Sequence, residues 1–154
     1  MIRAILAALL LAMTAAAEEL KGQVVRVSDG DTIVVLDAGK VQHKIRLAGI
    51  DAPEKAQAYG DKAKDALAAL VAGKEVRVEV SGRDRYGREI GRVFVGVVDA
   101  NLEQIKAGFA WHYAQFAPAA KDLAEAQEKA RAGKLGLWKN SAPVAPWDFR
   151  KKKA

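Results

Sequence analysis

The chain has 154 residues, with 25 Lys or Arg against 19 Asp or Glu, which gives a formal net charge of +6. Hydrophobic residues make up 51% of the sequence, which excludes intrinsic disorder, and the length suits one domain with one core. There is no cysteine, which excludes a disulfide framework, thiol catalysis and cysteine-ligated zinc. Since the only histidines are His43 and His112, any metal must be bound mainly by oxygen.

The N-terminal segment has the pattern of a secretory signal peptide. Arg3 precedes an apolar run, and small residues follow at Ala15–Ala17. The alternative is an uncleaved membrane anchor, but the uncharged stretch from Ala4 to Ala17 is shorter than the ~20 residues that a membrane-spanning helix needs. We therefore expect residues 1–17 to be cleaved, and the mature chain to be secreted or periplasmic without stable membrane association.

The first half of the mature chain predicts three short strands separated by two turns. β-Branched residues are frequent in these segments, and Asp, Ser and Gly punctuate them. The first expected strand contains Val25 and Val27, and the next two cover residues 32–36 and 41–47.

A change of period then predicts a helix followed by two more strands. Apolar residues fall at helical spacing over residues 60–72, and Gly73 supplies a stop. Strict alternation over residues 75–80 predicts a fourth strand, and residues 90–97 predict a fifth.

The C-terminal part predicts two further helices and a tail. The helices are expected at residues 101–107, with Asn101 as the N-cap, and at residues 119–132. The tail, residues 139–154, contains prolines and ends in a basic run, and we interpret it as a solvated end in preference to a dedicated nucleic-acid arm.

This order of elements is typical of a small closed barrel. The five-stranded OB-fold has its helix between the third and fourth strands, as the sequence predicts here. The predicted fold class is therefore α+β, a five-stranded OB-fold β-barrel with three helices, and the predicted domain covers residues 18–138.

The first motif with chemical potential is the turn Asp29-Gly30-Asp31-Thr32. It resembles the beginning of an EF-hand loop, but Ile33 and Lys40 stand where that loop needs oxygen ligands. The EF-hand is thus excluded, and an isolated Asp-Gly turn is most often an ordinary bend.

The second motif is Asp51-Ala52-Pro53-Glu54, which follows Arg46 within eight residues. Pro53 disfavours helical geometry at Ala52, so an extended turn is expected. Such a turn can present carboxylates together with main-chain carbonyls, which is the mixture of oxygen ligands that Ca²⁺ prefers.

The third motif is the basic turn Asp84-Arg85-Tyr86-Gly87-Arg88. On its own it fits either a solvated hairpin or a phosphate-binding loop.

Together, these three motifs on this strand pattern resemble the staphylococcal nuclease (thermonuclease) family. The resemblance extends over residues 20–138 and includes Gly108 and the segment Leu135-Gly136-Leu137-Trp138. It implies an OB-fold enzyme that hydrolyses DNA and RNA with one Ca²⁺ and leaves 3′-phosphate ends.

The resemblance also implies roles for individual residues. The metal ligands would be Asp31, Asp51 and the main-chain carbonyl of Ala52, where family archetypes carry Thr. The catalytic residues would be Glu54 as general base and Arg46 and Arg88 as the two arginines. Substrate would be bound by Arg85, which replaces a lysine of the best-known member, by Tyr86 and by Tyr113.

Two functions of different classes fit this sequence. One is a calcium-dependent endonuclease acting as a monomer on single-stranded or locally opened DNA and RNA. The other is an OB-fold module that binds single strands without cutting them. The carboxylates of Asp31, Asp51 and Glu54 favour the enzyme, because they would weaken nucleic-acid binding unless a cation neutralised them.

Overall fold

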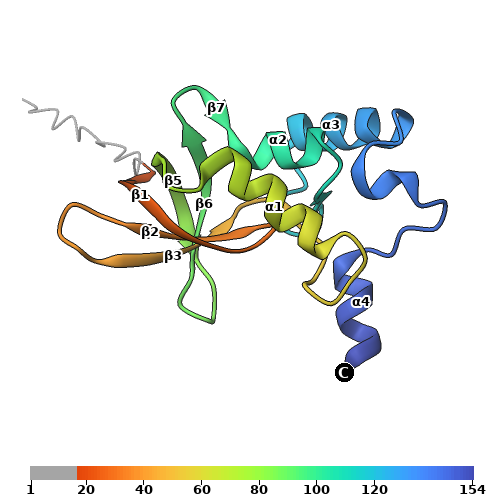
Figure 1. Cartoon of the computed structure of the whole chain (residues 1–154), viewed down its shortest axis with the longest axis horizontal. Coiled ribbons are helices and arrows are strands. Elements are labelled where there is room, and N and C mark those ends of the chain that lie inside the picture. The colour runs from red at the N-terminus through yellow and green to blue at the C-terminus, as the bar shows by residue number, and fades with distance from the viewer. Residues whose placement is uncertain (1–16) are drawn as a thin grey trace, which may run out of the picture.

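Five strands close into a β-barrel in the computed structural model (Figure 1). The structure describes residues 17–154. The strand order is β3-β2-β1-β5-β6, and the parallel pairing of β3 with β6 closes the barrel. The predicted OB-fold is therefore confirmed. The barrel strands are β1 (Glu18–Asp29), β2 (Thr32–Leu36), β3 (Gln42–Leu47), β5 (Glu75–Arg83) and β6 (Glu89–Val95). The expected signal peptide, apart from Ala17, lies outside the described residues.

Three very short strands complete the sheets. β7 (Val98–Asp99) extends the barrel sheet beside β6, whereas β4 (Ile50–Asp51) pairs with β8 (Trp111–His112) in a separate two-stranded sheet. This second sheet connects the end of β3 to the segment before the third helix, so it positions the residues that follow β3.

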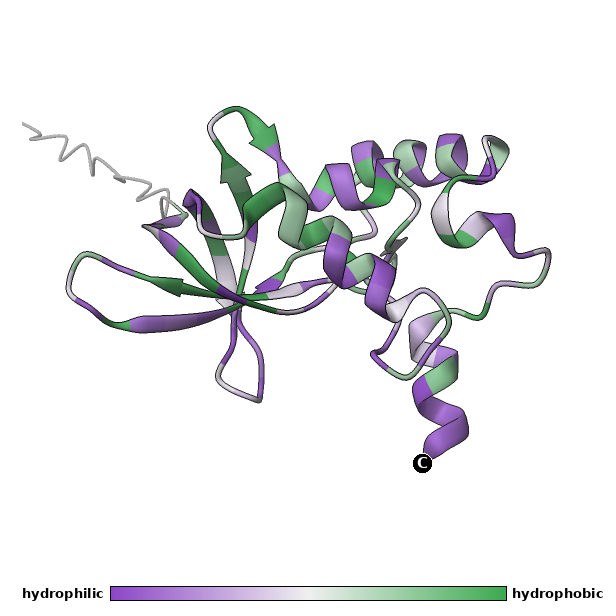
Figure 2. Cartoon of the chain, viewed as in Figure 1, coloured by the Kyte–Doolittle hydropathy of each residue, from purple (hydrophilic) through white to green (hydrophobic). Residues whose placement is uncertain are grey.

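The barrel interior is filled by alternating strand residues and by one face of a helix. Ile33, Ile45 and Val78 are fully buried, and each such side chain stabilises the fold by about 1.5–3 kcal/mol relative to exposure. Helix α1 (Gly60–Val71) buries Leu67 and Val71 against this core. Figure 2 shows hydrophobic residues along the barrel strands and α1.

The helix that follows β7 is capped by a different residue from the one predicted. In α2 (Ala100–Lys106) the side chain of Asp99 accepts from the Leu102 amide at 3.0 Å, so Asp99 is the N-cap. The prediction that Asn101 caps this helix was wrong. Asn101 is fully buried inside α2, where its amide group bonds to main-chain atoms of Val93 and Ala48. Its side chain therefore bonds to main-chain groups of β6 and of the segment after β3, and not to the end of the helix.

The C-terminal segment differs from the solvated end that the sequence suggested. After α3 (Lys121–Ala132) and the 3₁₀-helix η1 (Gly136–Lys139), the chain folds back and forms a fourth helix, α4 (Pro146–Lys153). α4, at the blue end of the ribbon in Figure 1, is hydrophilic along most of its length (Figure 2). The turn before it is tied to the body of the protein by a bond of 2.6 Å from Gln57 Nε2 to the Val144 carbonyl. Within residues 17–154, no helix is both long enough and apolar enough to cross a bilayer.

The imidazole of His43 bridges two carboxylates on the barrel surface. Its Nδ1 lies 2.7 Å from Glu89 and its Nε2 lies 2.8 Å from Asp37, while Arg83 lies 3.6 Å from the same Glu89 oxygen. The hydrogen bond to Glu89, followed by that to Asp37, raises the pKa of His43 above its ordinary value of 6.5. Protonated His43 therefore stabilises the folded state below pH 6.5, and this contribution is lost as the pH rises through the raised folded pKa.

We expect His43→Gln to reduce the dependence of stability on pH. Urea unfolding should be measured at about pH 6 and at about pH 9. Between these two pH values, the free energy of unfolding should fall more for the wild-type protein than for the variant. Equal losses in the two proteins would contradict a stabilising role of the protonated imidazole.

Candidate active site

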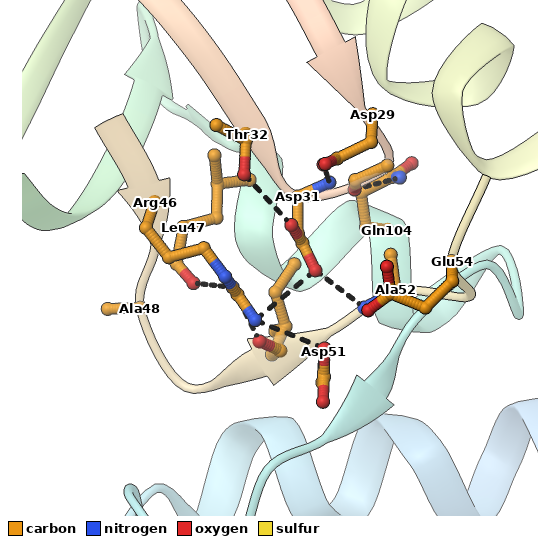
Figure 3. A network of polar contacts seen from close by, with 12 residues as sticks. Asp29, Asp31, Thr32, Arg46, Leu47, Ala48, Asp51, Ala52, Glu54 and Gln104 are labelled. Carbon is orange, nitrogen blue, oxygen red and sulfur yellow. Dashed lines mark hydrogen bonds and ion pairs between the residues drawn. The ribbon is translucent and has the colours of Figure 1, made fainter. Parts of the chain in front are cut away.

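The β1–β2 turn places Asp31 at the edge of the barrel, where it faces the segment after β3 (Figure 3). Gly30 allows this approach, because a Cβ there would lie 2.6 Å from Ala63 Cβ and 2.8 Å from Ala52 Cβ. Gln104 of α2 fixes the turn by donating to the Gly30 carbonyl at 2.8 Å. The turn is therefore a packed structure and not a solvated bend.

Asp29 gives this turn a second carboxylate. Its Oδ1 accepts from the Asp31 amide at 3.0 Å. Burial, followed by the negative charge of Asp31, raises the pKa of Asp29 to about 7. Asp29 was part of the motif in the sequence, but its place beside Asp31 becomes visible only in the structure.

Arg46 of β3 links the two carboxylates predicted to bind metal. Its Nη2 lies 3.2 Å from both Asp31 Oδ2 and Asp51 Oδ1, and its Nη1 donates to the carbonyls of Leu47 and Ile50 at 2.8 Å (Figure 3). The guanidinium is thus fixed by four acceptors. Arg46 belongs to the folded framework as well as to the site.

Asp51 is the most deeply buried acid of the site. It lies in β4 opposite Trp111 of β8, and its side chain is 1% exposed. Burial raises the pKa of Asp51, while Arg150 and Arg46 oppose that rise through a hydrogen bond and through their charges. A carboxylate this deeply buried is stable only beside positive charge.

The segment after β4 brings Ala52 and Glu54 to the same place. The Ala52 amide donates to Asp31 Oδ2 at 2.8 Å, which couples this segment to the β1–β2 turn. Glu54 remains 40% exposed, and its amide donates to Gln57 Oε1 at 3.1 Å. Gly60 at the start of α1 permits this path, since a Cβ there would overlap the Glu54 carbonyl. Asp31, Asp51, Ala52, Arg46 and Glu54 are therefore brought together as the sequence predicted.

Arg85 and Tyr86, which were predicted to bind substrate, and Arg88, which was predicted to be catalytic, lie on the separate β5–β6 hairpin. Asp84 organises it by accepting from the amides of Tyr86 and Arg88 and from Arg88 Nε at 2.6 Å. Arg85 donates to the Tyr86 hydroxyl at 2.9 Å, and Tyr86 is 69% exposed. Among residues 17–154, the structure joins this hairpin to the carboxylates of Asp31, Asp51 and Glu54 by no hydrogen bond or ion pair. Arg88 nonetheless directly precedes Glu89, which pairs with Ile45 beside Arg46.

Tyr113, the last predicted substrate residue, lies immediately after β8. Its amide donates to the Gly49 carbonyl at 2.8 Å, which holds it next to the segment that leads into β4. Its ring is stacked on Trp147 of α4, with centroids 5.1 Å apart and an interplanar angle of 7°. Tyr113 therefore lies beside the carboxylates, but α4 covers its ring.

Arg150 of α4 is the residue that the sequence interpretation missed. It donates to Asp51 Oδ2 and to Glu54 Oε1, at 2.7 Å in each case. The signal that could have revealed it is the spacing of Trp147 and Arg150, which puts one aromatic and one cation on the same face of a short helix. The run of basic residues around Arg150 hid that spacing.

The chemistry of these donors fits a hard divalent cation. Asp31, Asp51 and the Ala52 carbonyl offer only oxygen, and the two buried carboxylates require compensating positive charge. Arginine nitrogens now occupy both Asp51 oxygens. In the described part of the chain, no three acidic or histidine side chains are already gathered as a metal-binding group. The residues that could hold calcium are therefore Asp31, Asp51 and Ala52.

Comparison with known proteins agrees with this fold and identifies the family. The profile of the family described as "Staphylococcal nuclease homologue" matches residues 44–140. An Escherichia coli O157:H7 protein named "Uncharacterized endonuclease" is 46% identical over 88% of this chain and 88% of its own length. A Haemophilus influenzae protein of the same name is 44% identical over 84% of this chain and 72% of its own. The "Micrococcal nuclease" of Shigella flexneri is 36% identical over 97% of this chain and 92% of its own. The chain therefore belongs to the staphylococcal nuclease family.

Proposed function

We propose that this protein is a calcium-dependent endonuclease that hydrolyses DNA and RNA phosphodiester bonds and leaves 3′-phosphate ends. The observation that carries the proposal is the burial of Asp31 and Asp51 around one guanidinium, with the more exposed Glu54 beside them. A binding module would gain nothing from buried acids beside a phosphate groove. The nuclease names of the relatives support the same activity.

The protein's own residues would divide the chemistry as follows. A bound calcium ion would supply positive charge at the scissile phosphate. Glu54 orients a water molecule and takes its proton as the water oxygen attacks phosphorus. The bond from phosphorus to the 5′ oxygen breaks, and that oxygen takes a proton from solvent. Arg46 and Arg88 neutralise the charge that grows on the nonbridging oxygens.

The substrate would be a single strand or a locally opened duplex bound by one copy of the chain. Tyr86 offers an exposed aromatic ring, and Tyr113 has a ring of which Trp147 covers one face; an unpaired base can stack on such a ring. Arg85 lies next to Tyr86 and offers a planar donor pair to phosphate.

Digestion of supercoiled plasmid and of total RNA tests this proposal. We expect both to be cut in calcium and to remain intact in chelator. The DNA fragments should prime polymerase extension only after phosphatase treatment, because a 3′-phosphate blocks extension. Glu54→Gln, prepared in the same way, controls for a contaminating nuclease.

Equal cutting in calcium and chelator would contradict calcium dependence. Retention of single strands on a filter without any cleavage would instead support the OB-fold binding module.

A further inference from the structure

The guanidinium of Arg150 lies where a cation would have to bind. Its Nη2 is 2.7 Å from Asp51 Oδ2, and its Nη1 is 3.2 Å from Asp51 Oδ1 and 2.7 Å from Glu54 Oε1. One arginine thus engages both oxygens of the most buried acid and one oxygen of the proposed base. Bidentate pairs of this kind are the stronger class of charge-assisted hydrogen bond.

A second, independent contact holds α4 in place. Trp147 stacks flat on Tyr113, and it meets Trp111 edge-on with centroids 5.6 Å apart. Aromatic pairs of this geometry are worth about 0.5–1.5 kcal/mol beyond the area that they bury. Pro146 at the start of the helix is also buried. Trp147 and Arg150 are three residues apart, so both side chains lie on the same face of α4.

These two contacts cover the two parts of the site that a substrate complex needs. Arg150 pairs with Asp51, one of the two proposed metal carboxylates, and with the proposed base Glu54, while Trp147 covers one face of the Tyr113 ring. Because α4 is covalently attached, it competes at a high effective concentration without any added ligand.

We propose that α4 is a built-in inhibitor of this site, in which Arg150 takes the place of the divalent cation and must leave before calcium binds. This inference rests on the proposed function, since it assumes that Asp51 is a calcium ligand. Its physical basis is that Arg150 holds Asp51 Oδ2, the oxygen that Arg46 does not contact, and that a calcium ion bound to this oxygen would repel the guanidinium beside it. Calcium and the docked α4 are therefore mutually exclusive.

Calorimetric titration of the full-length chain with Ca²⁺ tests this competition. If the tail is docked in about nine molecules of ten, Arg150→Ala should bind calcium ~10-fold more tightly than the wild-type protein. Trp147→Ala should also bind more tightly, although it keeps the charge of Arg150. Lys152→Ala is the matched control, because it removes one exposed charge of the same helix that makes no contact with the carboxylates.

Hydrogen–deuterium exchange gives a readout that does not depend on activity. In the wild-type protein, exchange over residues 141–154 should increase when calcium is added. In metal-free Arg150→Ala it should already be at the higher level. Circular dichroism checks that each variant keeps the barrel.

The outcomes separate this inference from the proposed function. Calcium binding of equal affinity in wild type, Arg150→Ala and Trp147→Ala would overturn the competition and leave the calcium enzyme standing. Equal tightening by Arg150→Ala and Lys152→Ala, with no change in Trp147→Ala, would also overturn it, because net charge alone would then explain the effect. Absence of calcium binding in every variant would overturn both.

Discussion

Arg88→Ala should lower kcat for phosphodiester hydrolysis by at least ~10²-fold, the usual loss when one transition-state donor is removed. The stability of the protein should change little. Within residues 17–154, the side chain of Arg88 hydrogen-bonds only to Asp84 and also lies over the exposed Tyr86 ring at 5.6 Å. Asp84 still accepts from the amides of Tyr86 and Arg88 in the variant. Charge stabilisation is therefore removed while the hairpin keeps its shape.

Arg83→Ala provides the matched control for this experiment. Arg83 lies on the same hairpin and carries the same charge, but it is 66% exposed and contacts only Glu89, at 3.6 Å. Single-turnover rates at saturating DNA, with urea unfolding of each variant, separate rate from stability. A folded Arg88→Ala protein within about threefold of the wild-type rate would remove Arg88 from the catalytic residues.

The barrel could be predicted because its signals are local. Alternation in β5 and helical spacing in α1 depend only on neighbouring residues, and both elements lie within a few residues of their predicted bounds. The two-residue strands β4, β7 and β8 could not be predicted, because tertiary pairing alone defines them. The fourth helix was missed because its interactions are with distant parts of the chain.

The residues of the candidate site also divide into those that local motifs predict and those that only long-range contacts define. Asp31, Arg46 and Asp51 could be predicted because they fall in or beside motifs at the ends of adjacent strands. The contact of Arg150 with Asp51 spans 99 positions of sequence, so the local spacing of Trp147 and Arg150 could indicate an anchored helix face but not its partner. Composition made α4 look like a solvated basic run, whereas the contacts of Arg150 with Asp51 and of Trp147 with Tyr113 decide where it lies.

The structure also changes the expected role of Arg46 relative to Arg88. Their placement at a strand end and in a turn predicts that both matter for turnover more than for folding. Arg46, however, is 14% exposed and bonds to two main-chain carbonyls as well as to Asp31 and Asp51. Its loss would leave the buried Asp31 without its arginine and Asp51 with Arg150 alone, and a buried carboxylate without a partner destabilises a folded protein. Arg88 therefore gives the cleaner test of catalysis, and Asp51 the cleaner test of metal binding.

Asp51→Asn should weaken calcium binding by roughly 10²-fold, because the charge of the ligands sets the affinity of calcium sites. In a protein that is otherwise wild type, the measured loss of affinity would be smaller, because the same change also weakens the ion pair of Asp51 with the competing Arg150. The substitution should therefore be made in the Arg150→Ala background, where α4 no longer competes. Calorimetric titration with Ca²⁺ in the presence of a nucleotide measures the difference directly.

Ala52→Thr in the same background is the control that separates a side-chain ligand from a main-chain ligand. The proposed ligand at Ala52 is its carbonyl, which every residue has, so calcium should bind this variant about as well as the parent. Ala52 is 3% exposed and packs beside Gly30, so the added atoms must fit a tight space, and overpacking of this kind costs about 1–3 kcal/mol of stability. Unfolding by urea shows whether the barrel tolerates it. Unchanged calcium affinity in folded Asp51→Asn would mean that the cation is held by oxygens other than those of Asp51. Loss of binding in folded Ala52→Thr would contradict a ligand that is the main-chain carbonyl alone.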